Sequence, residues 1–497
     1  MALTTETPRT PRTPRTPRTP ETAAPGRGRR TTLWTFVVAS IAAFMSSLDN
    51  LVVTTALPAI RSSLHTSLAN LEWTVNAYTL VFAVLLLPAA TLGDRYGRRR
   101  VFSIGLTIFT VASAAAALAP NIGTLVAARA VQGVGGAVIL PLSLTILSAA
   151  VPPNRRGAAL GIWGAVSGLA VAVGPVVGGA VTQGVSWQWI FWLNVPIGIA
   201  LLPLAMRGLA ETHGAPSRLD LRGLVLVAAG LLGLTLGVIR GNTDGWTSPL
   251  ILTSLTLGTV LLAAFIAWEL RAAHPMLPLH LFRNRAFAAT NVAAMLFSFG
   301  MFGAIFLLAQ SLQIVNGYGP FGAGLRTLPW TAMPLLVAPW AGPLSDRIGG
   351  RPLLVTGLAM QSGGLLWLSR LLTTDVSYPT LVPAFVICGV GMALFFVPVA
   401  NVVLGAVRPD QEGIASGANN ALRELGGVFG IAVLGAVFSA SGGYANPAAF
   451  VAGTRPGVLI GGIVVGVGAV AAAAIPRRRH VVAATPDTAD VPLAVTG

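Results

Sequence analysis

The amino-acid sequence predicts an all-α membrane protein with fourteen spanning helices in two similar halves. Of its 497 residues, 54% are hydrophobic and only 10% are charged, a balance that an ordinary water-soluble core does not accommodate. Apolar runs of about 20 residues recur along the chain, and this length crosses a hydrocarbon core of roughly 30 Å. A polar motif that ends one run near residue 91 returns near residue 342, which indicates an internal repeat.

The charges indicate which side of the membrane each loop faces. All 32 basic residues are arginine and the net charge is +16, a value that taken alone is typical of nucleic-acid-binding proteins. Their positions argue against that class, because 25 lie in stretches that alternate to one side, five lie on the other side and two lie inside apolar segments. This is the positive-inside bias, so both termini are expected in the cytoplasm and no nucleic-acid partner is expected.

The chain begins with a polar segment that repeats the triplet Thr-Pro-Arg. It is too polar and too rich in proline to bury a core, so residues 1–32 are predicted to form a disordered basic cytoplasmic tail. The first apolar run, 33–60, is too long for the core of a signal peptide and is expected to remain as a helix. Spanning helices are predicted at 33–58, 72–92, 102–119, 123–147, 157–182, 188–206, 223–240, 250–269, 287–313, 322–344, 353–371, 379–404, 413–439 and 455–475.

The repeat keeps one register over a long stretch. At an offset of 256, residues 124–126 and 133–135 meet identical residues at 380–382 and 389–391. The fourth helix thus pairs with the twelfth, which predicts six helices, two additional helices and six more. Parallel repeats of this kind are typical of transporters that rock two bundles about a site near the membrane midplane. The predicted boundaries are a tail at 1–32, a six-helix bundle at 33–207, two additional helices with linkers at 208–285, a second six-helix bundle at 286–476 and a cytoplasmic tail at 477–497.

The repeated polar motif lies where a helix leaves the membrane. Its copies are TLGDRYGRRR at 91–100 and GPLSDRIGGR at 342–351. Arginine complements the negative C-terminus of a helix, and an aspartate can accept a hydrogen bond from the N-terminus of a neighbouring helix. A topology anchor needs only the arginines. Because the aspartate recurs in both halves, the pattern favours contacts that form in one conformation only.

Two charged residues of the first half are expected at a similar depth. Asp49 lies about nine residues, roughly 13 Å, below the outer end of the first helix at Pro58. Arg129 lies about six residues, roughly 9 Å, below the outer start of the fourth helix near Gly123. A buried carboxylate near an arginine can be poised to take and lose a proton as access alternates, so proton coupling is predicted for both residues. The alternatives are a structural pair and an arginine that snorkels to the headgroups.

The second half offers an internal comparison. At the offset of 256, Phe385 stands in place of Arg129, and residues 298–300, which match the region of Asp49, carry no charge. Proton handling is therefore predicted to reside in the first half.

Three more polar residues are candidates for the substrate cavity. Gln132 lies one helical turn from Arg129. Arg423 and Glu424 lie about ten residues into the thirteenth helix, close to the midplane. Adjacent residues on a helix point about 100° apart, so we expect that these two do not simply neutralise each other and that one of them faces the cavity. Glu424 has two open interpretations, a site for a cationic substrate or a pair with another helix.

Five segments carry a family resemblance: LDNLVVTTALP at 48–58, LGDRYGRRR at 92–100, RAVQGVGG at 129–136, GPVVGG at 174–179 and WQWIFWLNVPIG at 187–198. Together they resemble the major facilitator superfamily, and specifically its fourteen-helix drug:proton antiporter subfamily, over nearly all of 33–479. In that family the loop motif usually begins with glycine, where this chain has Ala90; the second copy keeps Gly342. The resemblance implies the major-facilitator fold, two six-helix bundles plus two extra central helices.

The resemblance also assigns roles to two motifs. The family's loop motif is understood as a conformational latch, and the positions that match it are Asp94, Arg95 and Arg98, with Asp346 and Arg347 in the second half. The family associates a glycine–proline pattern in the fifth helix with antiport rather than symport, and the alternative is that small residues serve close helix packing alone. The residues of that pattern here are Gly174, Pro175, Gly178 and Gly179.

The predicted function is a proton-coupled efflux antiporter that exports lipophilic drugs or antibiotics, cationic ones included, by alternating access across a bacterial cytoplasmic membrane. A proton-coupled importer of a small nutrient is the alternative, and it would need a more polar cavity. An enzyme is not expected, since the helices contain no HExxH, phosphate-loop or GxSxG pattern. No metal or cofactor is expected, with the proton as the coupling ion. The expected partners are the lipophilic substrate and membrane lipid, and the protein is expected to act as a monomer.

Overall fold

The computed structural model describes residues 25–152, 156–214, 219–408 and 411–476, and every regular element within these ranges is helical. The all-α membrane fold class predicted from the sequence is therefore confirmed. The elements are α1 (Pro25–Leu64), α2 (Leu68–Tyr96), α3 (Arg98–Ala117), α4 (Ile122–Ala150), α5 (Arg156–Gly184), α6 (Trp189–Trp192), α7 (Asn194–Gly208), α8 (Leu221–Asp244), α9 (Pro249–Glu269), the 3-10 helix η2 (Leu279–Arg283), α10 (Arg285–Ile314), α11 (Pro320–Thr331), α12 (Met333–Ile348), α13 (Gly350–Leu371), α14 (Tyr378–Leu404), α15 (Glu412–Ser441) and α16 (Pro447–Ala473).

Length and composition alone identify 12 spans among the described residues, with α6 and α7 joined as one. The two other predicted spans, 322–344 and 353–371, correspond to α11 with α12 and to α13. α11 and α12 are separated at Ala332, between Pro329 and Pro334, because proline lacks the N–H that continues a helix. α13 is less apolar because its buried face carries polar side chains, which include Gln361, Ser362 and Ser369.

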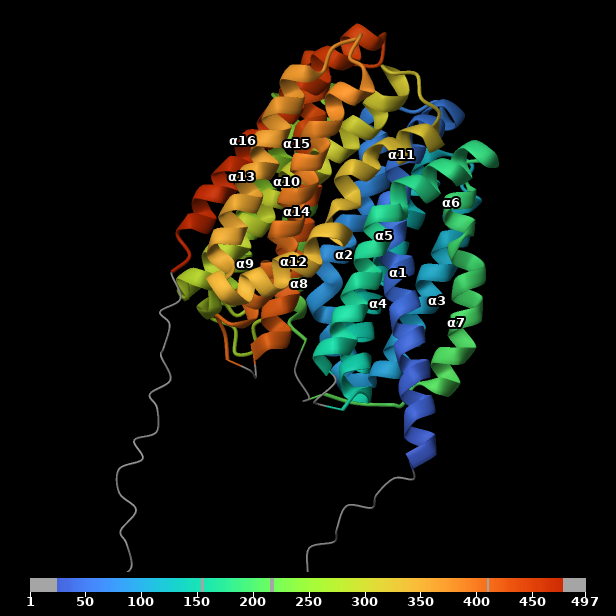
Figure 1. Cartoon of the computed structure of the whole chain (residues 1–497), viewed down its shortest axis with the longest axis vertical. Coiled ribbons are helices and arrows are strands. Elements are labelled where there is room, and N and C mark those ends of the chain that lie inside the picture. The colour runs from blue at the N-terminus through green and yellow to red at the C-terminus, as the bar shows by residue number, and fades with distance from the viewer. Residues whose placement is uncertain (1–24, 153–155, 215–218, 409–410, 477–497) are drawn as a thin grey trace, which may run out of the picture.

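The ends of the chain differ from the prediction at one point. α1 begins at Pro25, earlier than the predicted start at 33, so its first turns belong to the stretch that was assigned to the tail. Residues 1–24 and the predicted tail at 477–497 lie outside the described residues. In Figure 1 α1 begins at the lower end of the molecule, and α16 descends from the top to the lower left side. We call the lower end the terminal end, and the opposite end the seam end.

The helices form two groups, α1–α7 in blue to green and α10–α16 in green-yellow to red in Figure 1. One buried apolar cluster joins α1, α2, α3, α4 and α7 around Phe102 and Phe109. Another joins α10, α11 and α13–α16 around Phe297 and Phe385. The additional helices α8 and α9 pack on each other and, with α2 and α15, enclose a small cluster that includes Leu231. Each half therefore has a core of its own, and α8 and α9 are attached where the halves meet. A further buried cluster, which includes Leu57, Phe306 and Phe438, spans both halves.

The two halves are joined along a seam in which α5 packs on α11 and α2 packs on α15. Near the seam end, the Gln313 side-chain amide of α10 donates a hydrogen bond to the Thr55 carbonyl of α1 at 2.9 Å. The backbone N–H of Phe321 on α11 donates to Gln183 Oε1 on α5 at 3.1 Å. These bonds cross from one half to the other and hold the seam end closed.

The glycine–proline motif of α5 packs this helix against both halves. A Cβ on Gly178 would overlap the Val52 carbonyl of α1, within the same half. A Cβ on Gly179 would overlap the Pro320 carbonyl of α11, in the other half. Small residues therefore permit a backbone approach that any side chain would prevent. The motif divides between the two faces, with Gly174 and Gly178 toward α1 and Pro175 and Gly179 toward α11.

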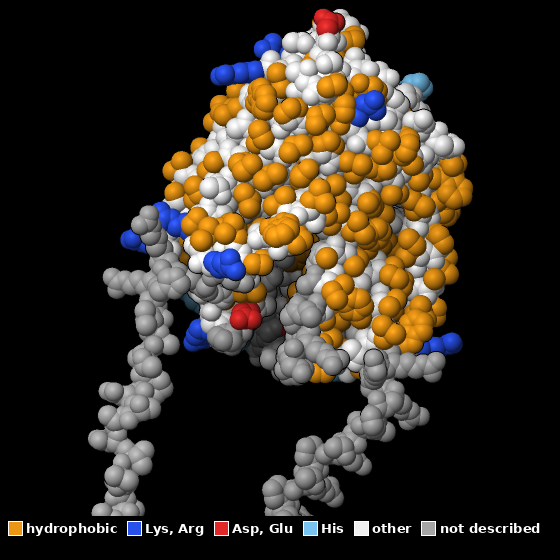
Figure 2. Space-filling view, in the orientation of Figure 1, with side chains coloured by type: hydrophobic (Ala, Val, Ile, Leu, Met, Phe, Trp, Pro, Cys, Tyr) orange, Lys and Arg blue, Asp and Glu red, His pale blue; other side chains and the backbone are white. Residues whose placement is uncertain are grey.

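The helices that continue the α5 seam diverge toward the terminal end. A Cβ on Gly164 or Gly168 of α5 would meet nothing within 4 Å. Ile162 on α5 is 53% exposed and Trp340 on α12 is 79% exposed. In Figure 2 the surface is hollowed between the two halves at this end. The structure is thus closed at the seam end and open between α5 and α12 at the terminal end.

We expect Gly179→Val to loosen the seam, whereas Gly164→Val serves as the matched control on the same helix. Valine adds the same helix penalty at both positions, but only the side chain at 179 meets a backbone carbonyl of the other half. The readout is maleimide labelling of a cysteine at Thr55, a buried seam residue, in detergent with Cys388 replaced by serine. Labelling should accelerate several-fold for Gly179→Val alone. Equal rates in both variants would show that the contact does not hold the halves together.

Candidate functional site

Asp49 is the acidic residue at the centre of the first half, on α1, with 2% of its surface exposed. Its Oδ2 accepts a hydrogen bond from Arg129 Nη1 of α4, and the two form an ion pair. Its Oδ1 accepts from Gln132 Nε2 of α4 and from Asn194 Nδ2 of α7, each at 2.8 Å. Both carboxylate oxygens are therefore satisfied by donors from other helices.

Arg129 is fully buried, and its donors point toward α1 and α2. Besides Asp49, Nη1 reaches Gln132 Oε1 at 2.7 Å, and Nε donates to the Thr74 carbonyl of α2 at 3.0 Å. The guanidinium carbon lies 4.3 Å from the centre of the Tyr78 ring, at the distance of a cation–π contact. Among the described residues, nothing accepts a hydrogen bond from its buried Nη2. This placement excludes the alternative that Arg129 snorkels to the headgroups.

Ser113 of α3 completes the arrangement. Its hydroxyl donates to the Phe109 carbonyl at 2.8 Å and accepts from Gln132 Nε2 at 2.7 Å. Asn194 Nδ2 approaches the same oxygen at 3.5 Å. The resulting set joins four helices, and polar groups buried in this way reinforce one another because no water competes with them. We call it the carboxylate network, and its members are Asp49, Ser113, Arg129, Gln132 and Asn194.

The matching region of the second half is aromatic. Phe385, which takes the place of Arg129 in the repeat, is 1% exposed and stacks on Trp330 with ring centres 6.1 Å apart. Ser298 is buried, and no described residue bonds to its hydroxyl. At this depth, therefore, the first half has a buried acid–arginine pair and the matching residues of the second half carry no charge.

Arg423 and Glu424 are not arranged as the sequence analysis expected. The expectation that adjacent helical positions keep them from neutralising each other is wrong, because Arg423 Nη2 lies 3.6 Å from Glu424 Oε1. The arginine stem is long enough to fold back across the 100° between neighbouring positions. The guanidinium also lies 5.3 Å from the Phe396 ring centre on α14.

The latch residues of the first half contact that half and the linker that follows it. Asp94 Oδ1 accepts from Arg98 Nε at 2.8 Å, one turn on, and the Asp94 carbonyl accepts from the Gly214 N–H at 3.1 Å. The Arg95 guanidinium lies 5.2 Å from the ring centre of the adjacent Tyr96. In the second half, Arg347 is exposed at the end of α12, and the side chain of Asp346 lies outside what the structure describes. A latch role for the five residues stays a prediction.

Glu72 is a buried acid that the sequence analysis missed. Its predicted helix start, 72, placed it at the membrane surface, whereas α2 begins at Leu68 and Glu72 is 1% exposed. A Cβ on Gly435 of α15 would overlap its carboxylate, and no described residue donates to its Oε2. Asn76, one turn further along α2, likewise has a buried amide without a described partner.

Two members of the carboxylate network were also missed. Asn194 lies within the segment WQWIFWLNVPIG, where one amide in an apolar run was a usable signal. Ser113 lies in an alanine-rich stretch and is too common a residue in membrane helices to stand out. The bond from Gln132 to Asp49 places that residue in the network, where it is fully buried.

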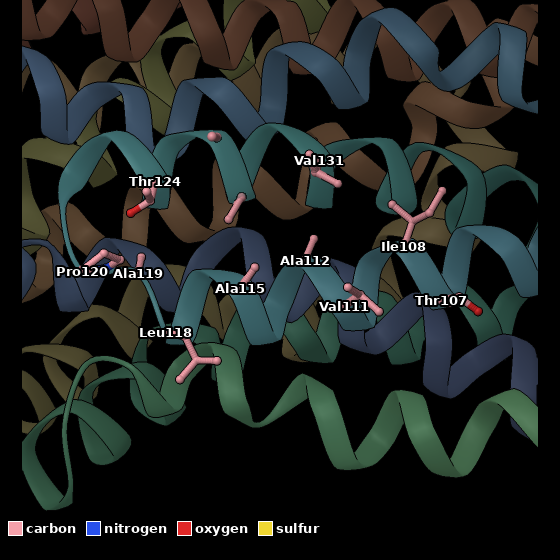
Figure 3. A pocket seen from close by; sticks show the side chains of 12 residues that line it. Thr107, Ile108, Val111, Ala112, Ala115, Leu118, Ala119, Pro120, Thr124 and Val131 are labelled. Atoms are coloured by element: carbon pink, nitrogen blue, oxygen red, sulfur yellow. The ribbon is translucent and has the colours of Figure 1, made fainter.

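An apolar groove on the outer face of α3 and α4 is separate from this network (Figure 3). Its volume is about 540 Å³, and Val111, Leu118 and Val131 on its wall are exposed, as expected for a surface against lipid tails. Among the described residues, no group of three His, Cys, Asp or Glu side chains is placed to hold a metal ion.

Comparisons with known proteins agree with the fold and extend it. The chain matches the family description Major Facilitator Superfamily over residues 39–430 and 290–497. It is 37% identical to the Multidrug resistance protein Stp of Mycobacterium tuberculosis over 413 residues, 83% of this chain and 76% of the relative. It is 40% identical to the Cephamycin export protein CmcT of Amycolatopsis lactamdurans over 436 residues, 85% of this chain and 88% of the relative. It is 34% identical to the Tetracenomycin C resistance and export protein of Streptomyces glaucescens over 426 residues, which are 85% of this chain and 79% of the relative.

Solved structures show the same fold at low identity. A bacterial homologue of the human lysosomal transporter Spinster superposes with a TM-score of 0.64 at 16% identity, over 90% of this chain and 97% of that one. A POT family transporter in complex with 5-aminolevulinic acid superposes with a TM-score of 0.67 at 16% identity, over 89% of this chain and 95% of that one.

We expect Asn194→Ala to destabilise the folded protein by about 1–3 kcal/mol, because it removes one donor from a buried carboxylate. Thermal unfolding in detergent measures the loss. The same substitution in an Asp49→Asn background should cost less, since the amide no longer serves a charge. Equal losses in the two backgrounds would show that Asn194 acts only through packing.

Proposed function

The chain belongs to the Major Facilitator Superfamily, and we propose that it is a proton-coupled antiporter that exports lipophilic antibiotics or drugs by alternating access. Relatives that are named multidrug resistance, cephamycin export and tetracenomycin C resistance proteins support drug efflux as the general activity. The proton as coupling ion, the sidedness and the roles of single residues are our proposals. The observation that carries the first of these is the burial of Asp49 and Arg129 in one hydrogen-bonded pair.

The separation of the halves supports alternating access. The seam end is closed by bonds such as that of Gln313 to Thr55, while α5 and α12 diverge at the terminal end. Closing the terminal end requires the two bundles to rock about the seam, which would break the backbone contact of Gly179 with Pro320. Each state would expose the central space to one side only.

The carboxylate network supplies a group that can respond to such a motion. In the structure Asp49 is buried and paired with Arg129. A proton on Asp49 would remove the charge that Arg129 binds, and the guanidinium would then need another partner or water. Two states of the pair can therefore be linked to two arrangements of α1 and α4. Drug and proton would compete by favouring different arrangements.

We further propose that the protein resides in the bacterial cytoplasmic membrane as a monomer, with the terminal end in the cytoplasm. The arginine-rich motif copies support this orientation, because Arg98 begins α3 and Arg347 lies in the last turn of α12. The hollow between the halves then opens to the cytoplasm, where an export cycle loads its substrate.

We expect Asp49→Asn to abolish drug accumulation against a gradient while downhill exchange of a neutral substrate persists. Asparagine cannot carry the proton but keeps the size of the side chain. One charge that crosses 100 mV yields roughly 2.3 kcal/mol, which at about 1.4 kcal/mol per decade sustains on the order of a fifty-fold gradient. Purified protein in liposomes, with the pH and voltage gradients imposed separately, measures both modes.

The control is Asp375→Asn, which removes an exposed acid from the loop between α13 and α14. It should transport as the parent does. If the Asp49→Asn protein still concentrates drug fully, another group carries the proton, and the buried acid Glu424 is the next candidate.

For the latch, Asp94→Asn and Asp346→Asn should each slow transport severalfold and leave equilibrium drug binding unchanged. Each aspartate is proposed to make a contact in one conformation only, so its loss alters the rate of interconversion rather than the substrate site. Turnover and drug affinity are measured on the same purified samples. Normal turnover with strongly weakened binding would contradict the latch.

A further inference from the structure

Arg423 contacts a carboxylate and an aromatic ring, two groups that can also bind organic cations. Its guanidinium lies 3.6 Å from the Glu424 carboxylate and 5.3 Å from the Phe396 ring centre. A carboxylate together with an aromatic face is the combination that recognises cations with little bound water. The chain therefore contains a cation site that its own side chain fills.

The position of this pair is central. Arg423 and Glu424 are about eleven and twelve residues from the start of α15 at Glu412, roughly 17 Å along the helix axis. At that depth the Arg423 side chain is 22% exposed and that of Glu424 is 8% exposed. α15 packs on α8, α10, α14 and α16, and on α2 of the other half, so the pair lies on a helix of the seam between the halves.

The fit of Arg423 to this site is incomplete. The distance to Glu424 Oε1 is longer than that of a strong charge-assisted hydrogen bond. Glu424 Oε2 is buried, and among the described residues no donor reaches it. Phe396 is partly exposed and packs edge-on against Phe297 and Phe395, with ring centres 5.4 and 5.6 Å away. A carboxylate oxygen thus lacks a partner, and part of the Phe396 ring stays exposed.

We propose that Arg423 is an internal cation that a lipophilic cationic substrate displaces from Glu424 and Phe396. The inference rests on the proposed export of drugs and names the charge class that this site takes. The exchange leaves Glu424 paired at every stage, because one monovalent cation replaces another. The guanidinium regains water as it swings into the central space, while the substrate, which holds water weakly, places its apolar groups against the phenylalanine rings.

In this exchange the added cation and the Arg423 guanidinium compete for Glu424, so the measured affinity for the cation depends on how strongly Arg423 is held. Removing Arg423 leaves the carboxylate free and should tighten binding of a cation, whereas removing the charge of Glu424 should weaken it. A merely structural pair would respond differently, because loss of either partner would destabilise the protein without a gain in affinity.

The test is equilibrium binding of tetraphenylphosphonium to the purified full chain in detergent, with no ion gradient. We expect Arg423→Gln and Arg423→Met to tighten binding about tenfold, Glu424→Gln to weaken it at least tenfold, and Phe396→Leu to weaken it severalfold. Tetraphenylborate has the same shape and the opposite charge, and its binding should not become tighter with either substitution of Arg423. Two replacements at 423 guard against one that fails to fold.

The matched control is Arg326→Gln. Arg326 lies 3.6 Å from the Tyr318 ring centre on the seam side, so its removal deletes the same charge and the same kind of contact elsewhere. It should leave phosphonium affinity within twofold of the parent. Unchanged or weaker phosphonium binding by both Arg423 variants, equal tightening by Arg326→Gln, or no binding by any variant would overturn the proposal. Because no gradient is present, these outcomes do not depend on whether export is coupled to protons.

Discussion

The ion pair of Asp49 with Arg129 is the interaction on which the first half depends. Each charge is costly to bury, and each becomes tolerable only because the other is present and the remaining donors and acceptors are largely satisfied. The satisfying groups come from α2, α3 and α7 as well as α1 and α4, so the helices must assemble around the pair. The same requirement makes the network sensitive to a proton, since neutral Asp49 would leave a buried guanidinium without its counter-ion.

The two halves share an architecture but differ in how they place their charged side chains. The first half encloses the pair of Asp49 and Arg129 fully, as the 0% exposure of Arg129 shows. The second half carries aromatic residues at the equivalent depth and pairs Glu424 with Arg423, whose side chain is 22% exposed. A closed pair suits a group that must be kept from water until the bundles move. A partly open pair suits a site that a solute can reach.

Much of this could be predicted from the sequence, since the fold follows from hydropathy and the repeat. Asp49 and Arg129 could be predicted to lie close together, because the rise per residue of a helix puts both at a similar depth in the membrane. Ser113 and Asn194 could not be found this way, as a small polar side chain gains its importance only from its neighbours. Arg423 was misjudged because direction from the helix axis does not limit a long flexible stem. Glu72 was missed because the start of α2 was placed four residues too late.

The central claim is that drug and proton compete through the first-half network. It is tested most directly by the protons released when a saturating drug binds the purified protein in weakly buffered detergent, followed with a pH-sensitive dye. In a series of measurements at different pH values, the account predicts release by the parent and none by the Asp49→Asn protein, although both bind the drug. Equal release by the two proteins, or binding by the parent without release at any pH, would contradict it.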